Sequence, residues 1–459
     1  MNSALAIKST VIFLLVSFLA FSGARANDRG DWKKIDVPPG TYQTTDGNGV
    51  AREITPSCSG GPVCTTNAAG VPSCRLGNKD FSFFFKPGKE KKKLVVFFDG
   101  GGACWDSNTC VTGQQTPLAA YVPELQGIST QGLFDQSNPK NPYRDWNLVV
   151  LPYCTGDIHW GSKDQSYTDF TGAVTGVPGG SVTIHHRGFD NFLYVREWLM
   201  SRFADQEKKN NKEEDDGDEK NEREGDKINK LLVTGSSAGA YGAAFAYPHL
   251  KQAFPRANGY LLADAGNGVI SDALLQQAVR LPDERWGASG NLVRNIPGMD
   301  GIFNQPADRF APAYFSALAG FFPNDRFSQY SSLFDVIQAL FFNISLNQNN
   351  IAAWGNLTPE VYGAWTNQMV NFAFITAANP NYRFYITRGC NHTVLRFNDD
   401  FYSAQTTQNP SFLNWFKALT REGENGAPPA NWVNSFCSGC AIPPTPQEVR
   451  ACLQRSFSN

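Results

Sequence analysis

Short apolar segments separated by polar and glycine-rich stretches predict several buried strands along the chain. The clearest lie at residues 94–98, 231–234, 259–263 and 382–387. Residues 191–199 predict a helix, and the small residues after position 239 are compatible with another. Each of the four predicted strands is followed closely by residues that can take part in catalysis.

The segment Gly235-Ser-Ser-Ala-Gly239 is a G-x-S-x-G match that follows the strand at 231–234 and precedes helix-compatible residues. This strand, turn and helix form the context that a nucleophile elbow requires. Glycines two residues before and after Ser237 leave room for a strained turn, which lifts the hydroxyl to the carboxyl edge of a sheet. The alternative is a Gly/Ser-rich turn without chemistry. The preceding strand favours Ser237 as a nucleophile.

A serine nucleophile needs a base, and the chain contains only five histidines, at positions 159, 185, 186, 249 and 392. In this class of fold the partners follow the serine in the order acid, then histidine. His249 lies twelve residues after Ser237, at the expected far end of the elbow helix. His392 lies in a loop after the late strand at 382–387. Elimination therefore predicts His392 as the general base rather than a surface histidine.

Three consecutive glycines follow the early strand at 94–98, in Asp99-Gly-Gly-Gly-Ala-Cys104. Such a loop can turn its backbone N–H groups toward a ligand and form an oxyanion hole. A further donor is expected from the N–H of Ala238, directly after the nucleophile. A flexible loop that binds nothing is the alternative, which the position upstream of the elbow disfavours.

Several segments together resemble the pectin acetylesterase family, which also includes the carboxylesterase Notum. They are Phe97-Phe-Asp-Gly-Gly-Gly-Ala-Cys104 with Cys110, Pro152-Tyr-Cys-Thr-Gly-Asp157, Arg187-Gly188, the elbow, Ala263-Asp-Ala-Gly266 and Cys390-Asn-His392. The resemblance covers most of the chain. It implies an α/β-hydrolase-like fold, with a mostly parallel central sheet flanked by helices, loop or cap insertions and several disulfides. It also implies ester cleavage by a Ser-Asp-His triad.

The acid of the triad has two candidates. Asp264 ends the strand that follows the elbow helix, a suitable position. The family's acid lies in a D-x-x-Q setting late in the chain, which Asp335-Val-Ile-Gln338 resembles. The resemblance favours Asp335, and Asp264 would then line the pocket or fix the loop behind the elbow.

The implied mechanism has His392 as base, Asp335 as its orienting acid, and the N–H groups of Gly101, Gly102 and Ala238 as oxyanion donors. Trp105, Asp157 and His159 lie in loops expected near the site, as does Trp160. We expect the first three, with Asp264, as candidate substrate contacts; for His159 a structural hydrogen bond is an equal alternative. No cofactor or metal is expected.

Residues 1–26 resemble a signal peptide, with Lys8, an apolar run and Ala24-Arg-Ala26 at the cleavage site. The prediction is a secreted or periplasmic monomer with one catalytic domain over 27–459 and no stable membrane anchor. A net charge of −2 argues against nucleic acid as a partner. The charged segment 205–230 has almost no apolar residue and predicts a disordered insertion within the domain.

Ten cysteines after a signal peptide predict a disulfide framework. Cys104 and Cys110 are expected to pair and stiffen the oxyanion loop, a pairing that the resemblance also supports. Two clusters hold three cysteines each, so each must send a bridge outside, with Cys154 and Cys390 as the partners. The clusters are Cys58, Cys64, Cys74 and Cys437, Cys440, Cys452. Metal binding by Cys437 and Cys440 is a disfavoured alternative.

The expected substrate is an acetylated, pectin-like polysaccharide. Aromatic segments at 314–322 and 339–342 could instead form an apolar pocket or lid for longer acyl chains or aliphatic polyesters, or could simply be core. A non-catalytic binding protein on a hydrolase scaffold is the second alternative, and the intact serine, glycine loop and histidine argue against it.

Overall fold

The computed structural model describes residues 32–67, 71–203, 228–282, 284–406, 410–423, 428–437, 440 and 443–457. The predicted signal peptide lies outside the described residues, and so does most of the predicted insertion. Residues 228–230, which the prediction included in the insertion, belong to the fold instead. Ile228 is buried and Lys230 begins a central strand, so the strand starts earlier than the charge pattern indicated.

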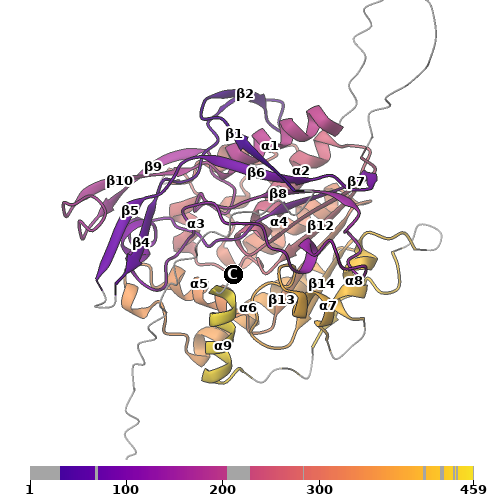
Figure 1. The fold of residues 1–459 in the computed structure, drawn as a ribbon. Coiled ribbons are helices and arrows are strands. Elements are labelled where there is room, and N and C mark those ends of the chain that lie inside the picture. Colours follow the sequence, from indigo (N-terminus) through magenta and orange to yellow (C-terminus); the bar gives the residue numbers. More distant parts are fainter. Residues whose placement is uncertain are drawn as a thin grey trace, which may run out of the picture.

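A nine-stranded sheet forms the centre of the molecule (Figure 1). In spatial order its strands are β1 (Lys33–Val37), β6 (Phe81–Lys86), β8 (Trp146–Leu151), β7 (Glu90–Phe98), β11 (Lys230–Ser236), β12 (Asn258–Asp264), β13 (Arg326–Ser332), β14 (Tyr382–Thr387) and β15 (Ser435–Phe436). Neighbouring strands are parallel from β8 to β15, and β1 and β6 are antiparallel additions at one edge. The predicted mostly parallel sheet is confirmed.

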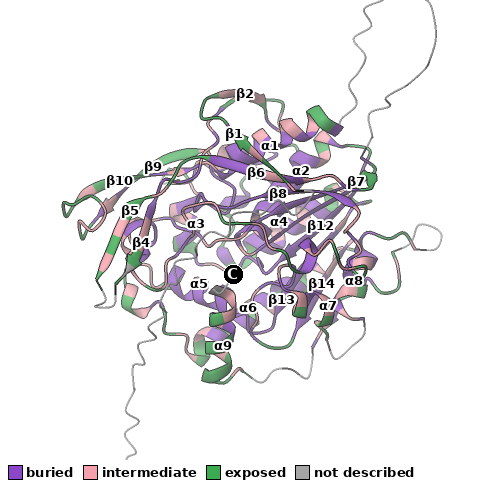
Figure 2. Ribbon diagram, in the orientation of Figure 1, coloured by how far each residue is buried: buried purple, intermediate pink, exposed green. Residues whose placement is uncertain are grey.

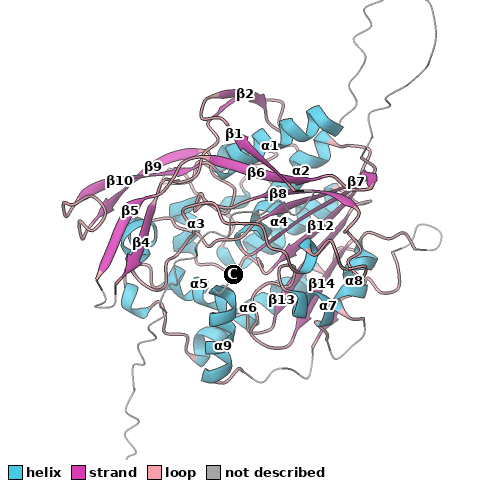
Figure 3. Cartoon of the chain, viewed as in Figure 1, coloured by secondary structure: helices cyan, strands magenta, loops and turns pink. Residues whose placement is uncertain are grey.

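Three hairpins and nine α-helices accompany this sheet within the described residues (Figure 3). The hairpins are β2 (Tyr42–Thr45) with β3 (Ala51–Ile54), β4 (Pro62–Thr66) with β5 (Pro72–Leu76), and β9 (Lys163–Asp169) with β10 (Gly180–His186). The helices are α1 (Gly188–Phe203), α2 (Ala238–Ala253), α3 (Asp272–Ala278), α4 (Ala307–Phe321), α5 (Val336–Leu346), α6 (Pro359–Thr376), α7 (Asn398–Ser403), α8 (Phe412–Leu419) and α9 (Pro446–Phe457).

Both faces of the sheet are covered, so its central strands are buried over most of their length (Figure 2). On β7, Leu94, Val96 and Phe98 belong to a core cluster with α1 and α2. Val95 and Phe97 belong to a second cluster with α8. Successive side chains of a strand point to opposite faces, and here both faces meet helices. This explains why the strands appear in the sequence as continuous apolar runs, and why their carboxyl ends meet at one edge.

Five disulfides join all ten cysteines. The predicted Cys104–Cys110 bridge is present. Each cluster of three cysteines was expected to form one bridge outside itself. These bridges are Cys58–Cys154 and Cys390–Cys452. The remaining pairs are Cys64–Cys74 and Cys437–Cys440, so the latter two sulfurs are covalently joined rather than free to bind a metal.

None of the helices described here is long and apolar enough to cross a membrane.

Three histidines are buried, and burial lowers their pKa values because it disfavours the charged ring. The pKa is lowered to about 4 for His159 and to about 3 for His186 and His249. The unfolded chain therefore takes up protons first as the pH falls below about 6.5. Burial raises the pKa of Asp157 and Asp264 to about 6, which opposes this effect between about 6 and 4.

Burial also raises the pKa of four further carboxyls, those of Asp99, Asp106, Asp190 and Asp400, which acts in the same opposing direction. We expect the net result to be a loss of stability between pH 6.5 and 4, because the histidine shifts are larger and take effect from a higher pH. Urea unfolding at pH 7, 5.5 and 4 would measure it. In His249→Gln the amide can still accept from the Gly47 N–H and donate to the Asn291 carbonyl, as the ring does. In this variant the free energy of unfolding should fall less between pH 7 and pH 4 than in the wild type. An unchanged pH dependence would contradict the role assigned to His249.

Candidate active site

Ser237 lies at a sharp turn between β11 and α2. Its φ of 58° and ψ of −124° are a strained conformation for an L-residue, and such strain is concentrated at functional sites. The turn is held because the Ser237 N–H donates to the Asp264 carbonyl at 2.8 Å. A side chain at Gly235 would collide with the Gly239 carbonyl, and one at Gly239 with the Phe98 carbonyl. The backbone geometry is therefore that of a nucleophile elbow.

His392 lies in the loop after β14 and contacts Asp335 through its Nδ1, which is 2.9 Å from both carboxylate oxygens. A carboxylate accepts, so Nδ1 carries the proton and Nε2 presents a lone pair. Within the described part of the chain, Nε2 is buried and has no hydrogen-bond partner. It lines the same pocket as Ser237. This tautomer is the one that can accept a proton from a serine hydroxyl.

Asp335 is itself held on several sides. It caps the amino end of α5, where its Oδ1 accepts from the N–H groups of Ile337 and Gln338, each at 3.0 Å. Its Oδ2 accepts from Gln338 Nε2 at 3.0 Å, and that amide also donates to Asn267. The cap and the amide fix the fully buried carboxylate against the imidazole. Asp335, rather than Asp264, contacts His392.

Asp264 ends β12 behind the elbow, where it fixes the neighbouring loop, the second of its two expected roles, rather than contacting the pocket. Its carboxylate accepts from Ser236 Oγ at 2.8 Å and from the N–H groups of Val394 and Leu395 at 3.0 Å. It is fully buried and outside the pocket lining. Burial raises its pKa to about 6, against the lowering effect of these hydrogen bonds. Asp264 ties the histidine loop to the elbow strand.

The glycine loop passes beside Ser237. Gly102, with φ 77°, forms an isolated antiparallel bridge with Tyr121. The two hydrogen bonds of this bridge flank Gly102, from the Val122 N–H to the Gly101 carbonyl and from the Ala103 N–H to the Ala120 carbonyl. The Gly102 N–H therefore stays outside the ladder.

Gly102 and Ala238 line the pocket with Ser237, as expected for oxyanion donors, whereas Gly101 is not part of the lining. A side chain at Gly101 would meet the Tyr153 ring, so this residue packs behind the loop.

One pocket joins the three parts of the site and encloses about 70 Å³. Its walls are mostly apolar and come from the elbow, the loop after β8, α3, α5 and the segment after α3. The lining residues are Gly102, Ala103, Ile158, Trp160, Ser237, Ala238, Tyr241, Ala265, Val269, Ile270, Leu274, Leu275, Val279, Trp286, Ile337, Gln338, Phe341 and His392.

The other expected substrate contacts are buried and are not among the residues that line the pocket, so their role is corrected to a structural one; for His159 this was the equal alternative. Trp105 is fully buried, and its indole donates to Gln348 Oε1 at 2.9 Å. Asp157 is fully buried and accepts from three groups of its own loop and from the N–H of Gly188, the first residue of α1, at 2.8 Å. His159 is 3% exposed and hydrogen-bonds to the Asp99 carbonyl. In each case the tight turns of the loop direct the polar group inward.

The pocket includes residues that the sequence analysis missed. Tyr241 lies one helical turn after Ser237, and Ile337 follows Asp335 on α5, so their positions could have been deduced from the triad. Leu274 and Trp286 come from the connection between β12 and β13, where no motif marks them.

The two aromatic segments have different roles. Tyr314 and Phe315 of α4 are buried in the core, and the Tyr314 hydroxyl donates to the Ala244 carbonyl. They are core rather than lid. From the segment 339–342, Phe341 reaches the pocket and Phe342 is buried beside it.

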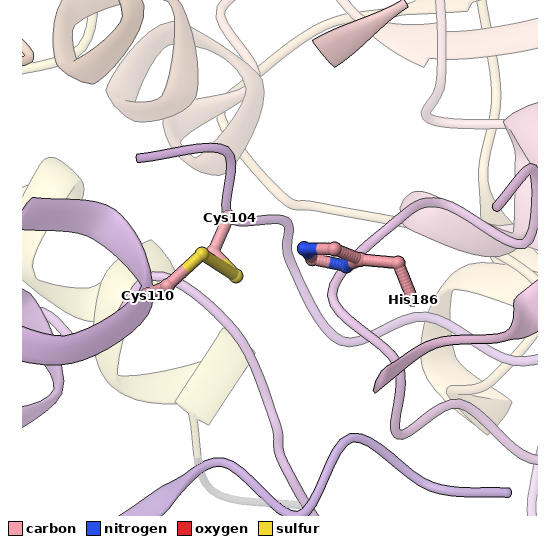
Figure 4. A group of neighbouring side chains, drawn as sticks. All are labelled: Cys104, Cys110 and His186. Atoms are coloured by element: carbon pink, nitrogen blue, oxygen red, sulfur yellow. A yellow bond between two sulfur atoms is a disulfide. The ribbon is translucent and has the colours of Figure 1, made fainter. Parts of the chain in front are cut away.

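His186 points toward the Cys104–Cys110 disulfide (Figure 4). Its Nδ1 donates to the Thr155 carbonyl and its Nε2 accepts from the Tyr167 hydroxyl, both at 2.9 Å. With both sulfurs in a disulfide and both ring nitrogens hydrogen-bonded, this cluster offers no free metal ligand. The three side chains pack the π-helix Asn108–Thr112 against the loop after β8.

Comparison with known proteins links part of the chain to esterases. A segment of palmitoleoyl-protein carboxylesterase Notum from Schmidtea mediterranea is 31% identical over 81 residues, which is 17% of this chain and 15% of that protein. The chain thus aligns with only 15% of the length of this curated relative. A solved structure of the Wnt deacylase Notum from Drosophila aligns over 86% of this chain and 99% of that chain, at 15% identity and a TM-score of 0.42.

The family model of pectinacetylesterase matches residues 66–209. This range contains the glycine loop and the segment after β8, whereas Ser237, Asp335 and His392 lie beyond it. The resemblance predicted from the motifs is confirmed: the chain is similar to the pectinacetylesterase family.

Proposed function

We propose that this protein is an exported, monomeric serine carboxylesterase with Ser237, His392 and Asp335 as its triad. The observation that carries the proposal is the buried, unpartnered Nε2 of His392 in one pocket with a strained Ser237. A protein that only bound ligands would need neither a serine in a strained turn nor an imidazole oriented by a buried carboxylate in the same pocket, so the arrangement favours catalysis over the binding-protein alternative.

In the proposed reaction His392 Nε2 takes the Ser237 proton while the hydroxyl oxygen attacks the ester carbonyl. The N–H groups of Gly102 and Ala238 stabilise the oxyanion of the tetrahedral intermediate. His392 then protonates the leaving alkoxide, and an acyl-enzyme remains. Water, deprotonated by His392, attacks this ester and releases the acid, which restores the serine.

The proposed substrate is a short acyl ester, most simply an acetyl group on a pectin-like polysaccharide. The small volume of the pocket, about 70 Å³, supports a short acyl group. The match to the pectinacetylesterase family supports a carbohydrate ester. Export is supported by the five disulfides, which form in oxidising compartments.

A longer acyl chain or an aliphatic polyester is the second candidate. The apolar walls favour it, because Leu274, Leu275 and Phe341 contribute no polar group that could bind a sugar. Of these, Phe341 is only partly buried and can yield space.

Hydrolysis of p-nitrophenyl esters from acetate to palmitate distinguishes the two candidates. We expect kcat/KM to be highest for acetate or butyrate and to fall at least about tenfold by octanoate, because an extra methylene in a closed pocket costs about 1–3 kcal/mol. Phe341→Ala should move the optimum toward longer chains, whereas Phe342→Ala, the neighbouring buried control, should not. A maximum at palmitate in the wild type would favour the second candidate.

A further inference from the structure

Asp99 lies where β7 gives way to the glycine loop, three residues before the expected oxyanion donor Gly102. Its backbone N–H donates to the Leu151 carbonyl at 2.9 Å, and its Oδ1 accepts from the Gly100 N–H at 3.0 Å. The side chain is 8% exposed. Any movement of Asp99 is therefore transmitted directly to the loop that faces Ser237.

His159 holds the backbone of Asp99. Its Nε2 lies 2.9 Å from the Asp99 carbonyl, and because a carbonyl only accepts, Nε2 carries the proton. Burial lowers its pKa to about 4, so the ring is neutral in this contact at neutral pH. The ring packs against Phe98 and Tyr153 at centroid distances of 5.2 and 4.8 Å. The backbone at His159 has a positive φ of 64°, which its tight loop enforces.

Arg396 holds the side chain of Asp99 from another element. Its guanidinium forms an ion pair with Asp99 Oδ1 at 2.9 Å and is 20% exposed. Arg396 lies four residues after His392 in the same loop, and the N–H groups of Val394 and Leu395 between them are bound by Asp264. The loop that carries His392 is therefore joined by this ion pair to the glycine loop that carries Gly102.

We propose that His159 and Arg396 are positioning residues that clamp Asp99 and so hold the Gly102 N–H at the oxyanion site. The inference rests on the proposed esterase function. It assigns to His159 a role in aligning the glycine loop, and to Arg396 a role in joining that loop to the histidine loop. A displacement of about 1 Å at such a site typically costs about a hundredfold in rate.

The test compares His159→Asn, Arg396→Gln and Arg396→Lys with the wild type on p-nitrophenyl acetate. Asn tolerates the positive φ at position 159, so His159→Asn removes the ring without backbone strain. We expect His159→Asn and Arg396→Gln to lower kcat about 10- to 100-fold with KM changed less than about threefold, because oxyanion contacts act mainly in the transition state. Arg396→Lys keeps the charge and should recover most of the loss.

Lys251→Gln is the matched control. It breaks an ion pair with Asp325 whose side chains are similarly buried, at 10% and 6% exposure. Lys251 lies at the far end of α2 from Ser237. This variant should lower the thermal midpoint and leave kcat within about twofold.

Inhibition by a trifluoromethyl ketone gives a readout that loss of stability alone would not change. This ketone forms a tetrahedral adduct with an active serine, so its Ki should rise in parallel with the fall in kcat/KM across the clamp variants. Unchanged Ki and kcat with only a lowered thermal midpoint would show that the clamp is merely structural. If Arg396→Gln does not fold, His159→Asn still decides by the same two constants. A wild type without Ser237-dependent turnover would overturn the proposed function and the clamp with it.

Discussion

Ser237→Ala is expected to lower kcat for p-nitrophenyl acetate by at least about 10⁴-fold, because loss of the nucleophile removes the acyl-enzyme route altogether. A small residual rate should remain, since Gly102 and Ala238 would still polarise the bound ester. The strained turn at Ser237 is compatible with alanine at no greater cost than with serine, so the fold should persist. Steady-state kinetics with circular dichroism at matched concentrations would measure both.

Ser236→Ala is the control for this change, because the adjacent serine differs only in where its hydroxyl points. Ser236 Oγ donates to Asp264 at 2.8 Å and is buried behind the elbow. Its loss should cost about 1 kcal/mol of stability and less than about tenfold in kcat. If instead Ser236→Ala abolished turnover and Ser237→Ala did not, the assignment of the nucleophile would be wrong.

Asp335→Asn is expected to lower kcat by about 10⁴-fold through the tautomer of His392. In the variant the amide oxygen would keep the place of Oδ1, where it accepts from the N–H groups that begin α5. The amide NH₂ would then face His392 Nδ1, which must become an acceptor. The ring proton moves to Nε2, and the base is lost.

Asp264→Asn decides between the two acids that the sequence leaves as candidates. Asp264 contacts Ser236 and the loop backbone rather than the imidazole, so its loss should loosen the histidine loop. We expect a stability loss of about 1–3 kcal/mol and a fall in kcat well below that of Asp335→Asn. A larger kinetic effect from Asp264→Asn would transfer the role of the acid to Asp264. Urea midpoints and kcat for both variants provide the comparison.

The sequence predicted the strand and the sharp turn at Ser237 well, because local pattern determines their geometry. The run before Gly235 had to be a buried strand, and small residues on both sides of Ser237 allowed a strained turn. The prediction of His392 as the base followed from elimination among the five histidines. The choice of Asp335 came from resemblance alone, because the contact between positions 335 and 392 joins two loops that no local pattern relates.

The direction of polar side chains in loops could not be predicted in the same way. Asp157 and His159 alternate along the chain with Ile158 and Trp160. Only Ile158 and Trp160 line the pocket. Positive φ values at Ile158 and His159 reverse the chain there, and a hydrophobic pattern does not encode such a turn. The wall from α3 and Trp286 likewise depends on tertiary packing across a long connection.

The charged connection between α1 and β11 meets β11 at its amino end. Ser237 follows the carboxyl end of this strand, at the opposite edge of the sheet. α1 ends at Phe203, and β11 starts at Lys230 and runs for seven residues before Ser237. At about 3.3 Å per residue, the start of that strand lies roughly 20 Å from the nucleophile. A fluorescent protein, or a tether to a solid support, could replace residues 204–227 at this point. An enzyme anchored there would turn its catalytic edge outward, toward a substrate too large or too insoluble to diffuse.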